Sequence, residues 1–591
     1  MPSVHLFLRD TSRRASLAAR VGVVTLATFA AAGSAASADV ADNVDTGGLR
    51  SLSGSYLAAR HAGTMKDLES AAAFYRRALD ADPENEVLLD RTVMLLVASG
   101  ALPQAVELAD DLAASDPTNQ LAALTLTVDA LANGDPVAAR DAMTPLSTGS
   151  PLPELTAALL EAWSYAAEEN YDRALLALDS LEGPDWYSTF TTLHSGLIAD
   201  FAGRHDDAIE RLAAAYEADP RAIRVLDAYA RALARADKLD EAKAVVANFI
   251  AEGGDHPLVQ QLSDALSSGE PVAPQITSAQ AGAAEALYGL GIAVGQEGGQ
   301  EYAASYLQLA LHLKPDTELA AFSLAALYEG MNQHDKAITV YRTIPDASPL
   351  ARTAKIQIGL NLNAEDKLDE AKTELQALVD ANPTDLSAIL ALGNVLRSDE
   401  DFEAARTVYG QGIETLDEPQ REHWTLFYFR GIANERTDHW PEAEADFRKA
   451  LELYPDQPLV LNYLGYSLID KHMKIDEAVE MIRTAVSQRP DDGFIVDSLG
   501  WAYYRLGRYD EAVAELERAV ELMPNDPVIN DHLGDAYWQV GRKLEAMFQW
   551  SHARDMDPEP KDLAKIKTKL EHGLQPDKTD AASVTNDETP R

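Results

Sequence analysis

A repeat of 34 residues constrains this chain more than any other feature of its sequence. Pro490, Pro524 and Pro558 follow one another at that interval, and so do Gly500 and Gly534. A unit of this length cannot bury its hydrophobic face alone and must stack on its neighbours. The spacing therefore predicts a stacked array of units rather than a single compact core, which 591 residues would in any case exceed.

Each unit is expected to consist of two amphipathic helices. In residues 499–524, Leu499 and Tyr503 share one helical face, Gly507 marks a turn, and a second apolar face follows. Pro524 ends the second helix because its ring cannot continue the hydrogen-bond ladder. About fourteen such units can be placed along the chain. We therefore predict an all-α superhelical solenoid.

The array is interrupted at Ser267–Gln280, slips in phase around Asp417–Glu422, and is bounded by two different ends. The segment S-S-G-E-P-V-A-P-Q-I-T-S-A-Q is rich in small residues and proline, which predicts a hinge between two arrays. The expected organisation is a signal peptide at 1–38, a flexible linker at 39–50, a first array at 51–266, the hinge at 267–280, a second array at 281–560, a capping helix at 561–574 and a disordered tail at 575–591.

The first 38 residues have the pattern of a secretory signal peptide. Four arginines precede a short apolar run at 21–32, and Ala36-Ser37-Ala38 supplies an A-x-A cleavage site. We expect export to the periplasm, by the Sec or the twin-arginine route. The sequence contains no cysteine, so we expect no lipid anchor on this chain, and no direct membrane insertion once the signal is removed.

The net charge of −45 limits the classes of partner. Residues 1–38 carry four Arg and one Asp, a charge of +3, so their removal leaves −45 − 3 = −48. A surface this acidic repels phosphate backbones and anionic lipid heads. We therefore expect protein partners and no nucleic acid.

Catalytic motifs are lacking. The patterns H-E-x-x-H, G-x-S-x-G and G-x-x-x-x-G-K-[ST] do not occur. Gly289, Gly291 and Gly295 approximate a dinucleotide-binding loop, but the last spacing is one residue too long and the segment lies inside a helical repeat. His532 and His552 are isolated in the sequence. We predict that the chain is not an enzyme and has no cofactor and no metal site.

Inward positions on the first helices of the last four units carry aromatic, amide and charged side chains. Together they predict a groove for an extended peptide or a docked helix. The alternative is that the large aromatic rings pack between neighbouring repeats. The predicted groove residues are Tyr428, Asn462, Tyr466, Asp497, Trp501, Tyr504, Arg505, Asp531, Asp535 and Trp538.

The corresponding inward positions of the first array are apolar. They include Leu124, Val128, Trp163, Phe190 and Leu197, which we call the apolar wall. A wall this long should not face water. Either it grips an apolar partner helix, or the array curls tightly and buries it on itself.

The spacing of glycine, alanine, tyrosine and proline resembles the tetratricopeptide repeat. The segments L-N-Y-L-G-Y-S-L-I-D (461–470), V-D-S-L-G-W-A-Y-Y-R-L-G (496–507) and H-L-G-D-A-Y-W-Q-V-G-R-K-L-E-A (532–546) are more specific. They resemble bacterial envelope adaptors of the LbcA type, which hold a carboxyl-terminal processing protease together with its cell-wall hydrolase substrates. Such adaptors can be lipoproteins, whereas this sequence has no cysteine to lipidate.

Two functional hypotheses follow. The first is a non-catalytic scaffold of the bacterial cell envelope, for which the resemblance implies a periplasmic protease and wall hydrolases as partners. The alternative is a cytoplasmic assembly or chaperone-like scaffold whose N-terminus is not cleaved.

Overall fold

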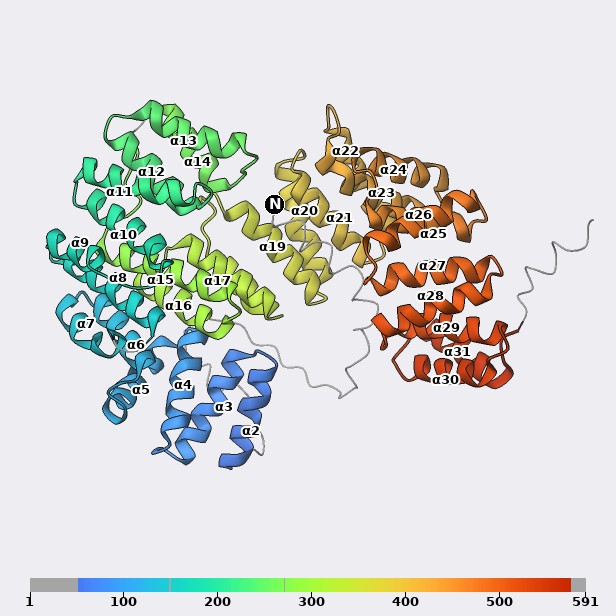
Figure 1. Ribbon diagram of the computed structural model, residues 1–591, viewed down its shortest axis with the longest axis horizontal. Coiled ribbons are helices and arrows are strands. Elements are labelled where there is room, and N and C mark those ends of the chain that lie inside the picture. The colour runs from blue at the N-terminus through green and yellow to red at the C-terminus, as the bar shows by residue number, and fades with distance from the viewer. Residues whose placement is uncertain (1–50, 148–149, 270, 576–591) are drawn as a thin grey trace, which may run out of the picture. The chain divides into compact units, whose positions relative to one another are not determined.

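The computed structural model describes residues 51–147, 150–269 and 271–575, and every regular element in these ranges is a helix (Figure 1). The described residues contain thirty α-helices, α2 to α31. Thirteen successive pairs pack together within the two units, and α14, α21, α22 and α31 fall outside these pairs. The predicted all-α solenoid of about fourteen units is confirmed. The predicted signal peptide, linker and tail lie outside the described residues, except for Gln575.

The chain divides into two compact units. The first unit extends to Asp399. Its helices are α2 (Leu52–Thr64), α3 (Leu68–Ala81), α4 (Glu86–Ser99), α5 (Leu102–Ser115), α6 (Gln120–Ala132), α7 (Pro136–Ala142), the 3-10 helix η3 (Thr144–Ser147), α8 (Pro151–Ala167), α9 (Tyr171–Asp179), α10 (Tyr187–Phe201), α11 (His205–Ala218), α12 (Ile223–Arg235), α13 (Leu239–Ala251), α14 (Pro257–Ser268), α15 (Ala279–Gln296), α16 (Gln300–Leu313), α17 (Glu318–Gly330), α18 (His334–Tyr341), α19 (Ala351–Ala364), α20 (Leu368–Ala381) and α21 (Leu386–Ser398).

The second unit begins at Glu400. Its helices are α22 (Phe402–Glu414), the 3-10 helix η4 (Arg421–His423), α23 (Trp424–Arg436), α24 (Trp440–Leu453), α25 (Pro458–Asp470), α26 (Ile475–Gln488), α27 (Gly493–Arg505), α28 (Tyr509–Leu522), α29 (Pro527–Gln539), α30 (Lys543–Arg554) and α31 (Pro560–His572).

Within a pair, the two helices approach closely because a glycine on the first faces a large side chain on the second. A methyl group at Gly500 would lie 2.6 Å from Cγ of Leu516, and one at Gly534 would lie 2.4 Å from Cδ1 of Trp550. In both pairs, the glycine and the large side chain are sixteen residues apart in the sequence. The same contact recurs between Gly196 and Leu212, Gly359 and Leu375, and Gly431 and Phe447. Steric contact therefore explains why glycine returns at a fixed place in these repeats.

The turn between paired helices depends on left-handed backbone in the last two units. Gly507 has φ +72° and Gly541 has φ +86°, a region that glycine enters without the penalty of a Cβ atom. After Gly507, the N–H of Arg508 donates to the carbonyl of Tyr503 at 2.9 Å. The predicted turn at Gly507 is therefore present, and α28 ends at Leu522, two residues before Pro524.

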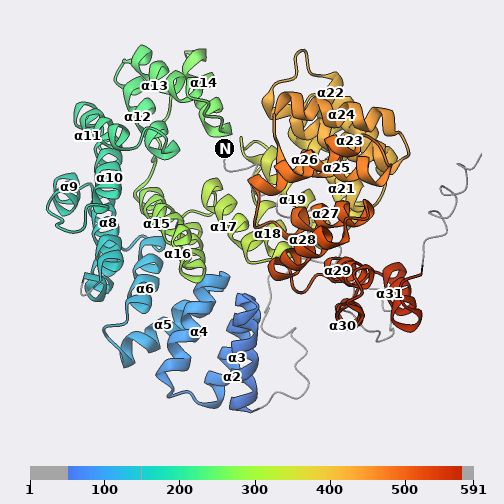
Figure 2. The ribbon, with the colours of Figure 1, turned by 45° about the vertical axis from the view of Figure 1, so that its right-hand side comes forward.

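After α14 the chain turns back into the first unit. Helix α15 packs against α8 and α10, and α16 packs against α4 and α6, so these segments lie side by side in both Figure 1 and Figure 2. A methyl group at Gly282 of α15 would lie 2.4 Å from the ring of Trp163 on α8, which is fully buried. Small residues on α15 allow this close approach of helix to helix.

The segment at 267–280 does not separate two arrays, contrary to the expected hinge. It is the connection from α14 to α15, and the first unit continues on both sides of it. Ile276 is buried within it, and Nη1 of Arg231 donates to the carbonyl of Ala273 at 3.2 Å. The compact units divide instead at Asp399 and Glu400. Burial of the apolar wall by α15 and α16 is the physical reason for this difference.

The contact between Gly282 and Trp163 generates a first prediction. The Gly282→Ala variant should lower the free energy of unfolding by about 1–3 kcal/mol, because the fully buried indole has no room for the added methyl group. Gly330→Ala is a matched control, since nothing lies within 4 Å of a methyl group there. Urea denaturation measures both values. Equal stability of the two variants would show that α15 does not pack tightly on α8.

Candidate functional site

The apolar wall of the first array is covered by the chain's own helices. Leu124, Val128, Trp163 and Leu197 are at most 4% exposed. Phe190 is half-buried, and a methyl group at Gly289 of α15 would lie 3.4 Å from its ring. Of the two alternatives for this wall, burial within the chain is the one observed, and α15 and α16 provide it. These five residues therefore line an internal interface.

A buried polar cluster accompanies this apolar contact. Nε and Nη2 of Arg224 on α12 each donate to Glu285 of α15 at 2.8 Å. Burial raises the pKa of Glu285, but the guanidinium outweighs it and leaves the pKa below its ordinary value. Nearby, Nε1 of Trp163 donates to Nδ1 of His194 at 3.1 Å. Arg224 and Glu285 are 61 residues apart, and no sequence pattern pointed to their pairing.

The second unit presents an aromatic cluster on its inner face, the face formed by the first helices α25, α27 and α29. The rings of Trp501 and Tyr504 on α27 are stacked with centroids 4.6 Å apart, and His532 on α29 stacks on Trp501 at 3.9 Å. Tyr466 on α25 is 37% exposed, while Trp501 and Tyr504 are half-buried. We call Tyr466, Trp501, Tyr504 and His532 the aromatic platform.

Polar contacts connect the helices beneath this platform. Nδ1 of His532 lies 3.0 Å from Oδ1 and 3.1 Å from Oδ2 of Asp497. Nη1 of the exposed Arg505 donates to Asp470 at 3.2 Å. Nε2 of Gln539 lies 3.4 Å from the hydroxyl of Tyr504, at the limit of a hydrogen bond. Each contact joins neighbouring first helices, so the platform side chains are held in a fixed arrangement.

Two of the predicted groove residues, Asn462 and Tyr466, lie on α25. Burial, followed by the charges of Asp497 and Asp470, raises the pKa of Tyr466 to about 12, so its hydroxyl is a neutral donor near pH 7. Asn462 is partly buried, and its Oδ1 is buried without a hydrogen-bond partner.

Tyr428 does not belong to this platform. It is 8% exposed, and its ring packs among Trp424, Phe447 and Tyr463 with centroid separations of 5.8, 6.2 and 6.1 Å. Its predicted position in a groove is therefore corrected to the core between α23, α24 and α25. The large aromatic area is buried more favourably among other rings than against water.

Asp531, Asp535 and Trp538 lie beneath the last helix rather than on an open surface. Nζ of Lys569 on α31 donates to Asp531 at 2.7 Å and to Asp535 at 2.8 Å. A methyl group at Gly573, just after α31, would lie 2.3 Å from the ring of Trp538. These three predicted groove residues therefore secure α31 to α29.

His532 and Lys569 were not predicted from the sequence as contact residues, although their spacing carries a signal. His532 follows its partner Asp497 by 35 residues, and Lys569 follows Asp535 by 34. Residues one repeat apart lie side by side on neighbouring first helices. A charged residue that meets an opposite charge at this interval is thus a candidate for a contact between repeats.

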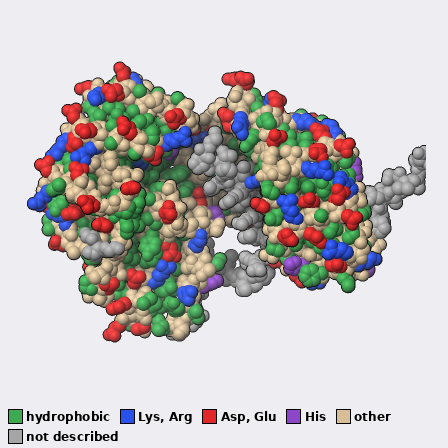
Figure 3. Space-filling view, viewed as in Figure 1, with side chains coloured by type: hydrophobic (Ala, Val, Ile, Leu, Met, Phe, Trp, Pro, Cys, Tyr) green, Lys and Arg blue, Asp and Glu red, His purple; other side chains and the backbone are tan. Residues whose placement is uncertain are grey.

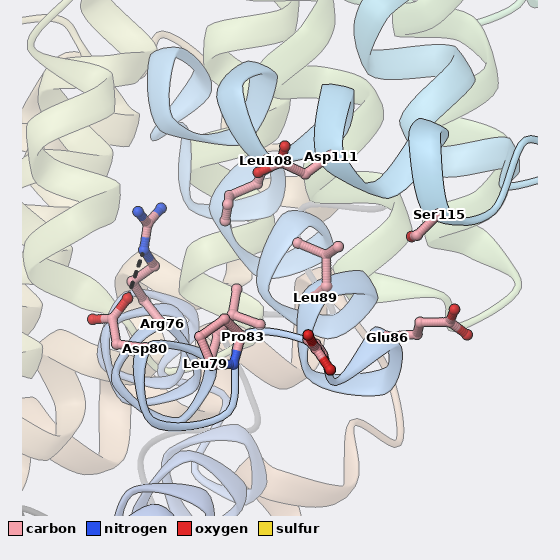
Figure 4. A pocket seen from close by; sticks show the side chains of 10 residues that line it. Arg76, Leu79, Asp80, Pro83, Glu86, Leu89, Leu108, Asp111 and Ser115 are labelled. Carbon is pink, nitrogen blue, oxygen red and sulfur yellow. Dashed lines mark ion pairs between the residues drawn. The ribbon is translucent and has the colours of Figure 1, made fainter.

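One surface hollow lies away from the platform, between α3, α4 and α5 of the first unit (Figure 4). Its volume is about 520 Å³, and Leu79, Leu89 and Leu108 are among the residues that line it. Nε of Arg76 lies 3.5 Å from Asp80 beside it. None of the residues predicted from sequence to bind a partner lines this hollow.

Charge is distributed over the surface rather than gathered into a metal-binding cluster. Figure 3 shows acidic and basic side chains interspersed on the visible face of each unit. Within the described ranges, no group of three or more His, Asp or Glu side chains could hold a metal ion. No helix in that part of the chain combines the length and the apolar character needed to cross a membrane.

Models of the tetratricopeptide repeat match three segments of the chain, at residues 55–85, 390–458 and 500–541. These matches and the helix pairs show that the chain contains tetratricopeptide repeats. The repeats indicate a protein–protein interaction scaffold, and a solenoid of this kind is typically non-catalytic.

One curated relative is the TPR repeat-containing protein PA4667 of Pseudomonas aeruginosa, which is 38% identical over 87 residues. The match spans 15% of this chain and 15% of the relative's own length. Among solved structures, the APC/C hetero-tetramer Cut9–Hcn1 aligns with a TM-score of 0.38 and 15% identity, over 88% of this chain and 96% of that one. Yeast Tom70 aligns with a TM-score of 0.36 and 14% identity, over 88% and 95%.

The different surroundings of Trp501 and Trp538 generate a second prediction. Trp538→Ala should cost about 2 kcal/mol more of unfolding free energy than Trp501→Ala, because only Trp538 lies between α31 and Trp550. Urea denaturation followed by circular dichroism measures the difference. If Trp501→Ala were the more destabilising change, Trp501 would be part of the core rather than of an accessible surface.

A third prediction concerns the pH dependence of the internal interface. Burial lowers the pKa of His194 from 6.5 to about 4, with Glu285 opposing and Arg224 reinforcing the change. Between pH 6.5 and pH 4, His194 is mainly protonated in the unfolded chain and mainly neutral in the folded protein. Stability is therefore full above pH 6.5 and is lost as the pH falls towards 4, by an amount on the order of 3 kcal/mol.

The His194→Asn variant tests this prediction, since its Oδ1 can accept the hydrogen bond of Trp163 but does not titrate. Urea denaturation at pH 7, 6 and 5 should show a smaller loss of stability in the variant than in the wild type. Carboxylates that titrate in both proteins cancel in this comparison. Parallel curves would mean that His194 takes up its proton in the folded protein as readily as in the unfolded chain.

Proposed function

We propose that this protein is an exported, non-catalytic adaptor of the bacterial cell envelope, and that the aromatic platform of its second unit binds a protein partner. The observation that carries the proposal is the accessible stack of Trp501 and Tyr504 beside the exposed Tyr466 and Arg505. Flat apolar area with hydrogen-bonding groups at its edge is typical of surfaces that recognise peptides and helices.

The burial of the apolar wall supports the aromatic platform, rather than the wall, as the partner-binding surface. The wall is already occupied by α15 and α16, so a partner would have to displace packed helices to reach it. Tyr466, by contrast, is 37% exposed, and the buried Oδ1 of Asn462 lacks a partner. The second unit therefore offers a partner an exposed aromatic contact area that no other helix of the described ranges covers.

The resemblance of segments 461–470, 496–507 and 532–546 to adaptors of the LbcA type supports a more specific partner. On that basis the partner is a carboxyl-terminal processing protease, which the scaffold brings together with cell-wall hydrolase substrates. The basic segment and apolar run before Ala38 support a periplasmic location.

A fourth prediction tests the partner and the surface together. A purified carboxyl-terminal processing protease should bind residues 39–591 in a surface plasmon resonance measurement. The double variant Tyr466→Ala, Trp501→Ala should weaken that binding about tenfold or more, since central aromatic residues dominate such interfaces. Tyr302→Ala is the matched control, because Tyr302 is a 54% exposed aromatic residue of the first unit.

Two results would contradict the proposal. Equal binding by the double variant and the control would place the contact elsewhere than on the platform. An intact Met1 species in the cytoplasm, with cytoplasmic proteins as the specific partners, would favour the alternative of a cytoplasmic assembly or chaperone-like scaffold.

A further inference from the structure

His532 occupies a position in the platform where a change of its charge acts directly on Trp501. Its ring lies nearly parallel to that of Trp501, at 17° with centroids 3.9 Å apart, and its side chain is 14% exposed. Trp501 is stacked on its other neighbour, Tyr504, at 10°. The indole is therefore in contact with a histidine from α29 and a tyrosine from its own helix.

The charged groups around His532 come from three helices. Asp497 of α27 contacts its Nδ1, while Asp531 and Asp535 lie on its own helix α29. Lys569 of α31 binds both Asp531 and Asp535. Burial alone lowers the pKa of His532, but Asp497 and then the other two carboxylates outweigh it and raise the pKa above its ordinary value of 6.5.

We infer that His532 is a pH-dependent support for the platform, which holds Trp501 in place while protonated and lets it move when neutral. This inference rests on the proposed function, because it concerns the regulation of the same surface. Partner binding at the platform should accordingly weaken as the pH rises.

The physical basis is that loss of one proton removes one interaction of His532 and weakens another. An imidazolium over the face of an indole is attracted by the negative electrostatic potential of the ring, and a neutral imidazole is not. The imidazolium also makes a charge-assisted hydrogen bond to Asp497, which is stronger than the bond from a neutral ring. Both interactions fix the register of α27 against α29 at the platform.

The direction of the effect follows from the raised pKa. At pH 6 the imidazolium predominates, and the full support of Trp501 is present. As the pH rises above 6.5 and through the pKa of the folded protein, the proton is lost and the support with it. A partner that contacts Trp501 should therefore bind about three- to tenfold more weakly at pH 9 than at pH 6.

The test begins with tryptophan fluorescence of the full chain between pH 5 and 9, because a stacked imidazolium and a neutral imidazole differ in their effect on the indole. We expect a transition with a midpoint above pH 6.5 that is absent from His532→Asn, whose Nδ2 can still donate to Asp497 but does not titrate. Trp501→Phe should also remove it. His552→Asn is the matched control and should retain it, since His552 lies on α30 away from the platform and stacks on Phe548 instead.

A second variant tests the cause of the raised midpoint without removing either ring. Asp497→Asn takes away the nearest carboxylate, so the transition should move to a lower pH while Trp501 and His532 remain. A transition that persists unchanged in His532→Asn, or that is unmoved in Asp497→Asn, would overturn the inference.

Binding of the purified carboxyl-terminal processing protease at pH 6 and pH 9 separates this inference from the proposed function. If the wild type loses affinity between these values and His532→Asn does not, the inference is supported. If Trp501→Ala weakens binding but His532→Asn has the same pH dependence as the wild type, the inference fails and the proposed function stands. If Trp501→Ala has no effect on binding, the proposed function fails, and with it the regulation of binding.

Discussion

The packing of α15 and α16 against the apolar wall is the interaction on which the first unit depends. First helices that carry Leu124, Val128 and Leu197 on one face would otherwise expose a long apolar surface to water. A partner protein can cover such a surface in many repeat arrays, but here the chain covers it with its own next helix pair. The glycine at position 282 is required because a larger residue would collide with Trp163.

That intramolecular cover makes the inner faces of the two units different. In the first unit α15 and α16 cover the inner face, and the ion pair of the partly buried Arg224 with the buried Glu285 fixes α15 in one register, since an unpaired charge there would be costly. In the second unit, the last helix α31 covers only the end of the inner face, through Lys569 and Gly573. The platform between α25 and α29 is left accessible, and its polar contacts hold the aromatic rings in position.

Repetition in the sequence explains most of what could be predicted. The recurrence of Gly500 and Gly534 and of the prolines at 34-residue steps was sufficient to predict the helix pairs and their number, because each pair repeats one local steric contact. The same periodicity placed Asn462, Tyr466, Trp501, Tyr504 and Arg505 on the first helices that form the inner face. It could not distinguish Tyr428, which is enclosed by Trp424 and Phe447, from residues that remain accessible.

By itself, then, the sequence determined the helical repeat, the positions of the turns and which side chains face the inner side of the array. All three arise from contacts within one repeat or between neighbouring repeats. Only the tertiary structure decided that α15 returns to α8, that Glu285 meets Arg224, and that the chain divides at Glu400 rather than at 267–280. Those contacts join segments far apart in the chain, and a local period carries no information about them. They are decided by which apolar surface can be buried, and that depends on the curvature of the assembled array.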